Sequence, residues 1–336
     1  MATESRKPYK ARRVTVFVCL ALLAPASVAL YIYSRTYAKA WRIGARMTPA
    51  AFESIMGRAV PALIGMSVAA VLIAIISLLF QTMTQSRILT PSMIGFDSIF
   101  VGTQTLLVFA FGAGSRLFTD PYINYLLSAG AMVAISVLMY GFILRRNKNN
   151  IIFLLMFGLV LSGILGNGAR YLQVIMDTND FYQVQAATNV TVNNMNTSII
   201  FLALPIMLVV IIAAMSRHRT YDVMSLGPDQ ARGLGVAYER EVNFNLVIIA
   251  VGMSVATALI GSLTFLGLLA VNISRELLKT HKHLPLFIAS ALLAALTLIL
   301  GQGAVELLQG AVPVTAIINL VGCSYMFYLI LRENRL

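Results

Sequence analysis

The sequence predicts an all-α membrane protein, a polytopic bundle of about ten transmembrane helices. Of its 336 residues, 59% are hydrophobic and 11% are charged. Soluble domains, by comparison, carry roughly 25% charged residues. The apolar residues also fall in long runs, and a helical crossing needs about 20 of them. Composition and patterning together therefore favour membrane helices over a soluble fold.

Ten apolar runs are candidate spans. In chain order they are 14–34, 59–80, 95–114, 123–143, 150–169, 197–215, 243–261, 263–278, 285–303 and 312–331. The first run also resembles the apolar core of a signal peptide, with a cleavage-like Ser27-Val28-Ala29, and this alternative stays open. The eighth run is short and polar, so nine crossings result if it does not span the membrane.

The net charge of +12 follows from the predicted topology. With the N-terminus in the cytoplasm, 18 of the 25 Lys and Arg residues lie on the cytoplasmic side. This asymmetry obeys the positive-inside rule for ten spans with both termini cytoplasmic. We therefore expect membrane lipid around the chain and no nucleic-acid partner.

The polar stretches are too short to form a soluble domain. The longest are 35–57, 170–196 and 216–242. We expect one membrane-embedded domain over 1–336, with a basic cytoplasmic N-terminus at 1–13 and a cytoplasmic loop at 216–242. Segment 170–196 should be an outer loop with room for a short helix.

Three small residues, Gly158, Ser162 and Gly166, recur every fourth position inside the fifth run. This pattern lets two membrane helices approach closely. It predicts packing inside the bundle or, as the alternative, a contact between subunits.

Several kinds of chemistry are not favoured by the sequence. All three histidines, His218, His281 and His283, fall in predicted cytoplasmic loops, which predicts neither a metal-binding helix nor a buried imidazole relay. The sequence has no G-x-x-x-x-G-K-[ST] phosphate-binding loop. The ionisable residues Asp97 and Glu306 are predicted near membrane interfaces, whereas a proton-coupled carrier usually keeps such groups at mid-membrane. We therefore expect no catalytic residues and no metal site, and an intramembrane enzyme is disfavoured.

The cytoplasmic stretch 225–241, "SLGPDQARGLGVAYERE", predicts a short rigid helix in a loop. Pro228 suits the first helical turn, Asp229 complements the helix N-terminus, and a Gly-Leu-Gly stop follows at Gly233. A helix presented in this way is suited to docking a soluble partner.

These residues resemble the permease subunits of ATP-binding-cassette (ABC) importers for iron(III)-siderophores, haem and cobalamin. Members carry a pattern like L-G-x-x-x-A-R-x-L-G-V before a membrane span. The matching residues are Leu226, Gly227, Ala231, Arg232, Leu234, Gly235 and Val236. The stretch 261–275 aligns with a second family motif. It departs from that motif at Ser262, at Thr264 and at Val271-Asn272, which replaces Pro-His.

The stretch "RILTPSMIGFDS" at 87–98 matches the family's cytoplasmic link between the second and third spans. Four residues are predicted to shape this turn: Gln81, Pro91, Gly95 and Asp97. Pro91 disfavours helix at the preceding residue, Gly95 permits the turn, and Asp97-Ser98 can cap the next helix. The form of the stretch looks most like paired permeases for catecholate-type siderophores.

The resemblance implies a type II ABC importer permease architecture. It implies a permease that moves ferric siderophore across the bacterial cytoplasmic (inner) membrane. The partners would be a second homologous permease, as a heterodimer rather than a homodimer, two copies of a cytoplasmic ATPase, and an extracytoplasmic siderophore-binding protein. ATP and Mg would be bound by the ATPase, so no cofactor is expected in this chain. A haem or cobalamin importer permease and a self-sufficient secondary transporter are the alternatives.

The resemblance also implies two sets of contact residues. Those expected to couple to the ATPase are Leu226, Gly227, Asp229, Ala231, Arg232, Leu234, Gly235, Lys279, His281 and Lys282. Those expected to dock the binding protein are Arg42, Arg46 and Arg58.

Overall fold

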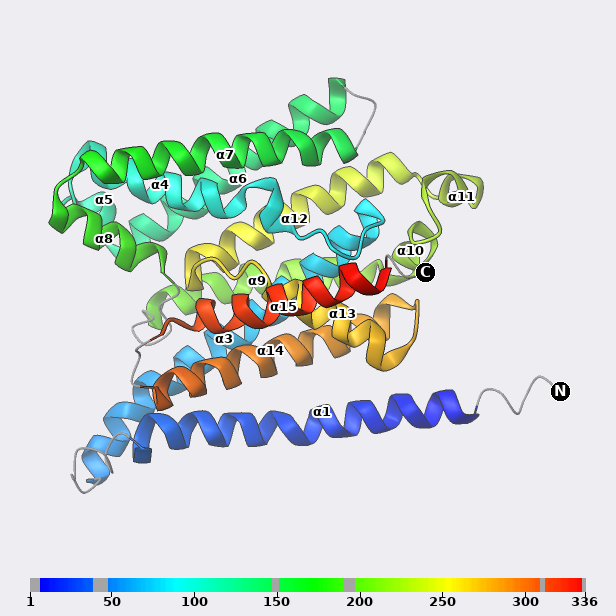
Figure 1. Ribbon diagram of the computed structural model, residues 1–336, viewed down its shortest axis with the longest axis horizontal. Coiled ribbons are helices and arrows are strands. Elements are labelled where there is room, and N and C mark those ends of the chain that lie inside the picture. The colour runs from blue at the N-terminus through cyan, green and yellow to red at the C-terminus, as the bar shows by residue number, and fades with distance from the viewer. Residues whose placement is uncertain (1–6, 39–47, 147–150, 190–196, 309–311, 334–336) are drawn as a thin grey trace.

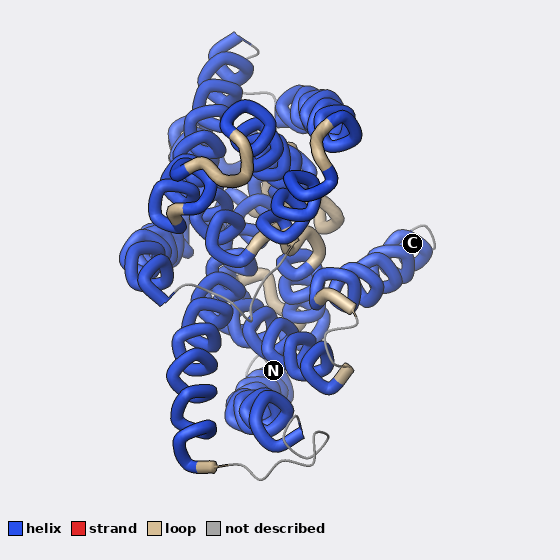
Figure 2. The backbone as a smooth tube through the Cα atoms, turned by 90° about the vertical axis from the view of Figure 1, so that its left-hand side faces the viewer, coloured by secondary structure: helices blue, strands red, loops and turns tan. Residues whose placement is uncertain are grey.

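The computed structural model describes residues 7–38, 48–146, 151–189, 197–308 and 312–333. Within these ranges the chain is helical and contains no strand, and the helices are seen nearly end-on in Figure 2. The predicted all-α fold is confirmed.

Each of the ten predicted runs forms a helix. They are α1 (Lys7–Tyr33), α3 (Pro49–Thr84), α4 (Phe96–Phe111), α6 (Pro121–Arg146), α7 (Ile151–Ile175), α9 (Thr197–Ser216), α12 (Tyr238–Ile260), α13 (Leu266–Leu278), α14 (His283–Leu307) and α15 (Val314–Glu333). Short elements join them: η1 (Ser34–Ala38), η2 (Pro91–Ile94), α5 (Arg116–Thr119), α8 (Thr178–Thr188), α10 (His218–Met224) and α11 (Pro228–Gly233). Helix α8 is the short helix predicted within 170–196.

One predicted boundary is wrong, and the length of the eighth run, which the sequence left open, is now given. Helix α3 begins at Pro49, inside the stretch 35–57 that was predicted to be a polar loop. The Thr48 side chain caps its N-terminus, and a proline suits the first helical turn. The eighth run yields only the 13 residues of α13. A helix of that length rises about 20 Å, and the hydrocarbon core is roughly 30 Å thick. Helix α13 therefore does not cross the membrane by itself.

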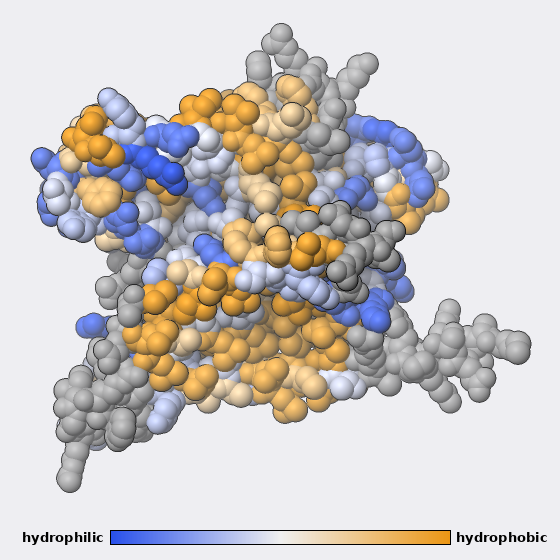
Figure 3. All heavy atoms as spheres, viewed as in Figure 1, coloured by the Kyte–Doolittle hydropathy of each residue, from blue (hydrophilic) through white to orange (hydrophobic). Residues whose placement is uncertain are grey.

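Among the described helices, seven are long and apolar enough to cross a membrane, and Phe96–Phe111 and Val314–Leu329 are shorter apolar helices. Figure 3 shows apolar side chains over the middle of the molecule, with hydrophilic ones gathered at the ends that hold α8 and α11. In Figure 1, α1 begins and α15 ends at the same end of the bundle as α10 and α11. A bilayer crossing the long helices fits this distribution.

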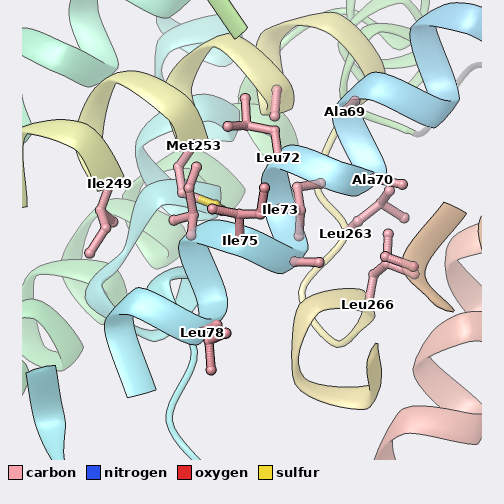
Figure 4. Close-up of a cluster of buried hydrophobic side chains, with 14 of the residues drawn as sticks. Ala69, Ala70, Leu72, Ile73, Ile75, Leu78, Ile249, Met253, Leu263 and Leu266 are labelled. Atoms are coloured by element: carbon pink, nitrogen blue, oxygen red, sulfur yellow. The ribbon is translucent and has the colours of Figure 1, made fainter. Parts of the chain in front are cut away.

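Helix α3 is the centre of the bundle. It packs against α14, α12, α9 and α13. In its most apolar window 72% of the residues are buried, compared with 22% for α7. Figure 4 shows Leu72, Ile73 and Ile75 of α3 meeting Met253 of α12 and Leu266 of α13. Lipid is as apolar as these side chains, so close packing and dispersion contacts rather than exclusion of water favour this arrangement.

The small residues of α7 pack within the chain, as the first of the two predicted alternatives states. The Ser162 hydroxyl lies 2.7 Å from the Ser98 hydroxyl of α4. A Cβ on Gly158 would lie 2.9 Å from the Cα of Ile94 and 3.0 Å from its carbonyl oxygen. Glycine at 158 therefore allows α7 to contact the backbone of η2.

We expect Gly158→Ala to destabilise the protein by about 1–3 kcal/mol, because the added methyl group must displace backbone atoms of η2. Thermal unfolding of the purified permease in detergent would measure the loss. Gly163→Ala in the same helix is the matched control, since a Cβ there has no atom within 4 Å. Equal stability of the two variants would contradict this packing.

Candidate coupling site at one end of the bundle

Two glycines give the predicted docking loop its shape. Gly227 and Gly235 have φ angles of 104° and 87°, in the left-handed region that favours glycine. A Cβ at either position would meet no atom within 4 Å, so backbone conformation rather than lack of space requires glycine. Between them Pro228 opens α11, as predicted. The loop therefore holds a single short helix between two sharp turns.

Arg232 joins α11 to the start of α12. Its guanidinium donates hydrogen bonds to Glu239 at 2.6 and 2.9 Å and to Asp229 at 3.1 Å. The hydrogen bonds to Glu239, together with the charges of Glu239 and Asp229, raise the pKa of Arg232 above its ordinary value. In this conformation Arg232 stabilises the loop itself. The sequence prediction missed Glu239, whose only signal was its place as an acidic residue in the first turn of α12.

The outer surface of the loop is apolar at two points. Leu226 and Leu234 are 53% and 65% exposed, whereas Ala231 is buried and fixes α11 against the protein. Asp229 is also exposed. Exposed leucines beside a rigid polar helix provide the kind of surface that a protein partner covers.

The second predicted contact lies in the connection between α13 and α14. Lys279, His281 and Lys282 are exposed there, and Lys279 ends α13 with a φ of 46°. This connection lies beside α10, because the next residue, His283, contacts Asp222. The structure thus brings together both predicted coupling segments.

His283 contradicts the expectation that no imidazole is buried in a relay. It is the first residue of α14 and only 2% exposed. Its backbone N–H donates to Asp222 Oδ1 at 2.6 Å, and its Nδ1 lies 2.8 Å from the same oxygen. Its Nε2 lies 2.8 Å from the hydroxyl of Thr82 in α3. His283 therefore links α10, just before the docking loop, to two long helices of the bundle.

The Thr82 hydroxyl also lies 2.9 Å from the carbonyl oxygen of Leu78. With one proton, it can donate to Leu78 or to His283, but not to both. We refer to the contacts of Asp222, His283 and Thr82 as the histidine link.

The predicted turn after α3 is formed by three of its four residues. The Gln81 side chain donates to the Arg87 carbonyl at 3.1 Å, Pro91 opens η2, and Gly95 has a φ of 105°. The predicted cap by Asp97-Ser98 is wrong, because Gly95 occupies the N-cap position of α4 without a side-chain hydrogen bond. Asp97 instead accepts a hydrogen bond from Thr264 at 2.8 Å.

Thr264 and Asn272, two residues at which the sequence differs from the family motif, contact this turn. Thr264 precedes α13 and contacts Asp97, 167 positions away in sequence, and its hydroxyl lies 3.4 Å from that of Ser262. The Asn272 side chain donates to the Arg87 carbonyl at 2.9 Å. Ser262, Thr264 and Asn272 thus hydrogen-bond with the 87–98 segment or with one another.

The predicted binding-protein contacts lie elsewhere. Arg58 is exposed near the start of α3, at the opposite end of the bundle from α11. Arg42 and Arg46 lie outside the described residues.

Long apolar helices and a short exposed helix between two glycine turns are thus combined in the described part of the chain. Among the described residues, no three His, Cys, Asp or Glu side chains are grouped to hold a metal ion. The sequence model of the FecCD transport family matches residues 15–332. The chain belongs to the FecCD transport family, and the resemblance to ABC importer permeases is confirmed.

Two relatives illustrate this similarity. The petrobactin import system permease protein YclO of Bacillus subtilis is 36% identical over 78% of this chain and 84% of its own length. The petrobactin import system permease protein FatC of Bacillus anthracis is 30% identical over 85% of this chain and 81% of its own length. A solved structure, described as a metal-chelate type ABC transporter in an inward-facing conformation, superposes with a TM-score of 0.79 at 19% identity. The superposition covers 95% of this chain and 99% of that one, and it shows that the fold is shared.

Proposed function

We propose that this chain is the transmembrane permease subunit of an ABC importer that carries ferric siderophore across the bacterial cytoplasmic membrane. Family membership and the petrobactin permeases among its relatives support the cargo class. The observation that carries the coupling role is α11, which stands between two left-handed glycines and presents Leu226 and Leu234 outward. The whole of 1–336 acts as one permease domain, with 216–242 as its coupling loop.

The energy comes from partner subunits in this proposal. Two ATPase copies bind ATP and Mg, a second, non-identical permease completes the pathway, and an extracytoplasmic protein delivers the siderophore. The chain itself catalyses no covalent step. The lack of a phosphate-binding loop in the sequence supports this division of labour.

The contacts suggest how movement reaches the pathway. Closure of the ATPase pair would displace α11, and the Arg232–Glu239 ion pair would carry that displacement into α12. The histidine link would carry the displacement of α10 into α14 and α3. Changes in the packing of these helices would then open the cavity between the two permeases to alternate sides.

Uptake of radiolabelled ferric siderophore by cells that express the complete importer tests this function. Uptake should require the permease and an ATPase with an intact phosphate-binding loop. Uptake of haem or cobalamin alone would establish the alternative cargo. Uptake that survives inactivation of the ATPase would establish a secondary transporter and contradict the proposal.

Both termini should lie in the cytoplasm, on the side of α11, because most basic residues fall there. Reporter fusions at residue 336 should be active only with the reporters that work in the cytoplasm. A fusion that is active on the outer side would contradict this orientation.

Arg58 should help to dock the binding protein through an acidic surface on that protein. Because charges at the rim of an interface act mainly on association rate, Arg58→Glu should slow docking roughly 10-fold at low salt and less at high salt. Surface plasmon resonance over a salt series would measure this effect. Arg116→Glu, an exposed charge on α5, is the control. Equal rates at all salt concentrations would leave Arg58 as an interfacial anchor only.

A further inference from the structure

Asp97 lies at the middle depth of the bundle, although the sequence predicted it near a membrane interface. It is in the first turn of α4, and the hydroxyl of the next residue, Ser98, lies 2.7 Å from that of Ser162. Ser162 is close to the middle of α7, which is long and apolar enough to cross a membrane. The carboxylate of Asp97 is therefore inside the membrane rather than at its surface.

The segment that contacts Asp97 is a break between two helices at the same depth. Residues 261–265 are not helical and join α12 to α13. Helix α13 has 13 residues and packs along α14, which has 25, so the break lies beside the middle of α14 (Figure 1). A Cβ on Gly322, close to the middle of α15, would lie 2.5 Å from the Cβ of Phe265. Among the described residues, the carbonyl groups of 261–264 accept no backbone hydrogen bond. The break therefore offers backbone oxygens at the depth of Asp97.

Three hydroxyl groups lie around the Asp97 carboxylate. Its Oδ2 accepts a hydrogen bond from Thr264 at 2.8 Å, and the hydroxyl of Ser262 lies 3.4 Å from that of Thr264. The hydroxyls of Ser92 and Ser262 also lie beside the carboxylate. Oδ1 of Asp97 is buried and has no hydrogen-bond partner. The positive end of the α4 dipole and the hydrogen bond from Thr264 favour the ionised carboxylate.

This negative charge has no cationic side chain to balance it. Among the described residues, no Lys, Arg or His lies within ion-pair distance of Asp97. A charged side chain inside a membrane is costly and is almost always paired. A proton on Oδ1 would remove the charge, but its O–H would have no acceptor in reach, and an unsatisfied buried donor is costly.

A metal cation meets both requirements, because it removes the charge and is coordinated by oxygen atoms alone. The site has one carboxylate. A monovalent cation therefore makes it neutral, whereas a divalent cation would leave a net positive charge inside the membrane.

We propose that Ser92, Asp97, Ser262 and Thr264 bind an alkali-metal cation, sodium or potassium, inside the membrane. The carbonyl groups of the break between α12 and α13 would complete the oxygen ligands, as unwound backbone does at the sodium sites of secondary transporters. The bound ion would hold η2 and the start of α4 against the start of α13. Sequence motifs did not predict this site, because Asp97 and Thr264 are 167 positions apart.

Equilibrium binding to the full-length permease in detergent tests the site, with radioactive sodium as one probe and radioactive rubidium as the probe for potassium. Asp97→Asn should remove one bound ion per chain. Ser262→Ala removes one oxygen ligand and should weaken binding about 10-fold. Ser98→Ala is the matched control, because its hydroxyl is on the same turn of α4 but contacts Ser162, and binding should be unchanged.

Thermal unfolding of the same protein gives a second readout. Replacing choline chloride by sodium or potassium chloride at equal ionic strength should raise the unfolding temperature by roughly 3–8 °C, because a ligand that binds only the folded state stabilises it. Asp97→Asn should abolish this response. Asp177→Asn alters an exposed carboxylate at the start of α8 and should retain the response.

Three outcomes would overturn the proposal. One is the absence of saturable binding and of a thermal response in the parental protein for both ions. Another is an Asp97→Asn protein that folds and still binds the ion as tightly as the parent. The third is an unfolding temperature that changes with pH through Asp97 but with neither ion, which would show that the carboxyl carries a proton instead. If Asp97→Asn does not fold, unchanged binding in Ser262→Ala contradicts the ligand set. Neither readout needs cargo or ATP, so the result is independent of the proposed importer function.

Discussion

Gly235→Val should abolish substrate-stimulated ATP hydrolysis and uptake while the permease still inserts and still docks its binding protein. A β-branched residue is strained at the observed φ of 87°, at a cost of about 1–3 kcal/mol. The turn that ends α11 would change shape, and the docking surface would move with it. Coupling between sites typically amounts to about 5–150-fold, so the loss of stimulation should be at least ~10-fold. ATP hydrolysis by the reconstituted complex, with and without loaded binding protein, measures it.

Arg232→Glu should have the same consequence by a different route, because it places a third carboxylate beside Asp229 and Glu239. Gly233→Ala is the matched control: its φ is not positive and a Cβ there meets no atom within 4 Å. Parental rates of transport in Gly235→Val and Arg232→Glu proteins that insert normally would refute the coupling role of this loop.

Asp222→Ala should uncouple transport from ATP hydrolysis and also lower stability. The substitution leaves the buried His283 without its acceptor, and hydrogen bonds to charged groups contribute about 1.5–3 kcal/mol. The displacement of α10 would no longer reach α14 and α3. Thermal unfolding should show the loss of stability, and uptake per ATP hydrolysed should show the loss of coupling.

His218→Gln is the control for this prediction, because His218 lies on the same helix and its Nδ1 lies 3.1 Å from the Met215 carbonyl oxygen, outside the contacts of Asp222, His283 and Thr82. A double-mutant cycle between Asp222→Ala and His283→Gln isolates the pair, since residues in one hydrogen-bonded network show non-additive effects. If the two substitutions add and uptake per ATP hydrolysed is unchanged, the histidine link has no coupling role.

The sequence was informative where local patterns decide structure. Apolar runs predicted the helices, because an apolar segment of about 20 residues satisfies its own backbone hydrogen bonds in lipid. Pro228 and the glycines around α11 predicted a short helix with sharp ends, because backbone conformation at those residues is a local property.

Local patterns could not predict the histidine link or the contact of Asp97 with Thr264. Asp222 and His283 are 61 positions apart in sequence, Thr82 and His283 are 201 apart, and each pair meets only because α3, α10 and α14 pack together. Hydrophobic periodicity identifies a helix but does not say which of its residues face a given neighbour. His283 was therefore placed in a loop, although it is the first buried residue of α14.

The single proton of the Thr82 hydroxyl gives the histidine link a tolerance to protonation of His283. When His283 is neutral, Thr82 can donate to its Nε2, and when His283 is protonated, Nε2 can donate to Thr82, whose own proton then goes to the Leu78 carbonyl. Both protonation states keep every distance as it is, and Asp222 accepts from Nδ1 in each. If the histidine link connects the ATPase to the pathway as proposed, acidification would leave that connection in place without rearranging a helix.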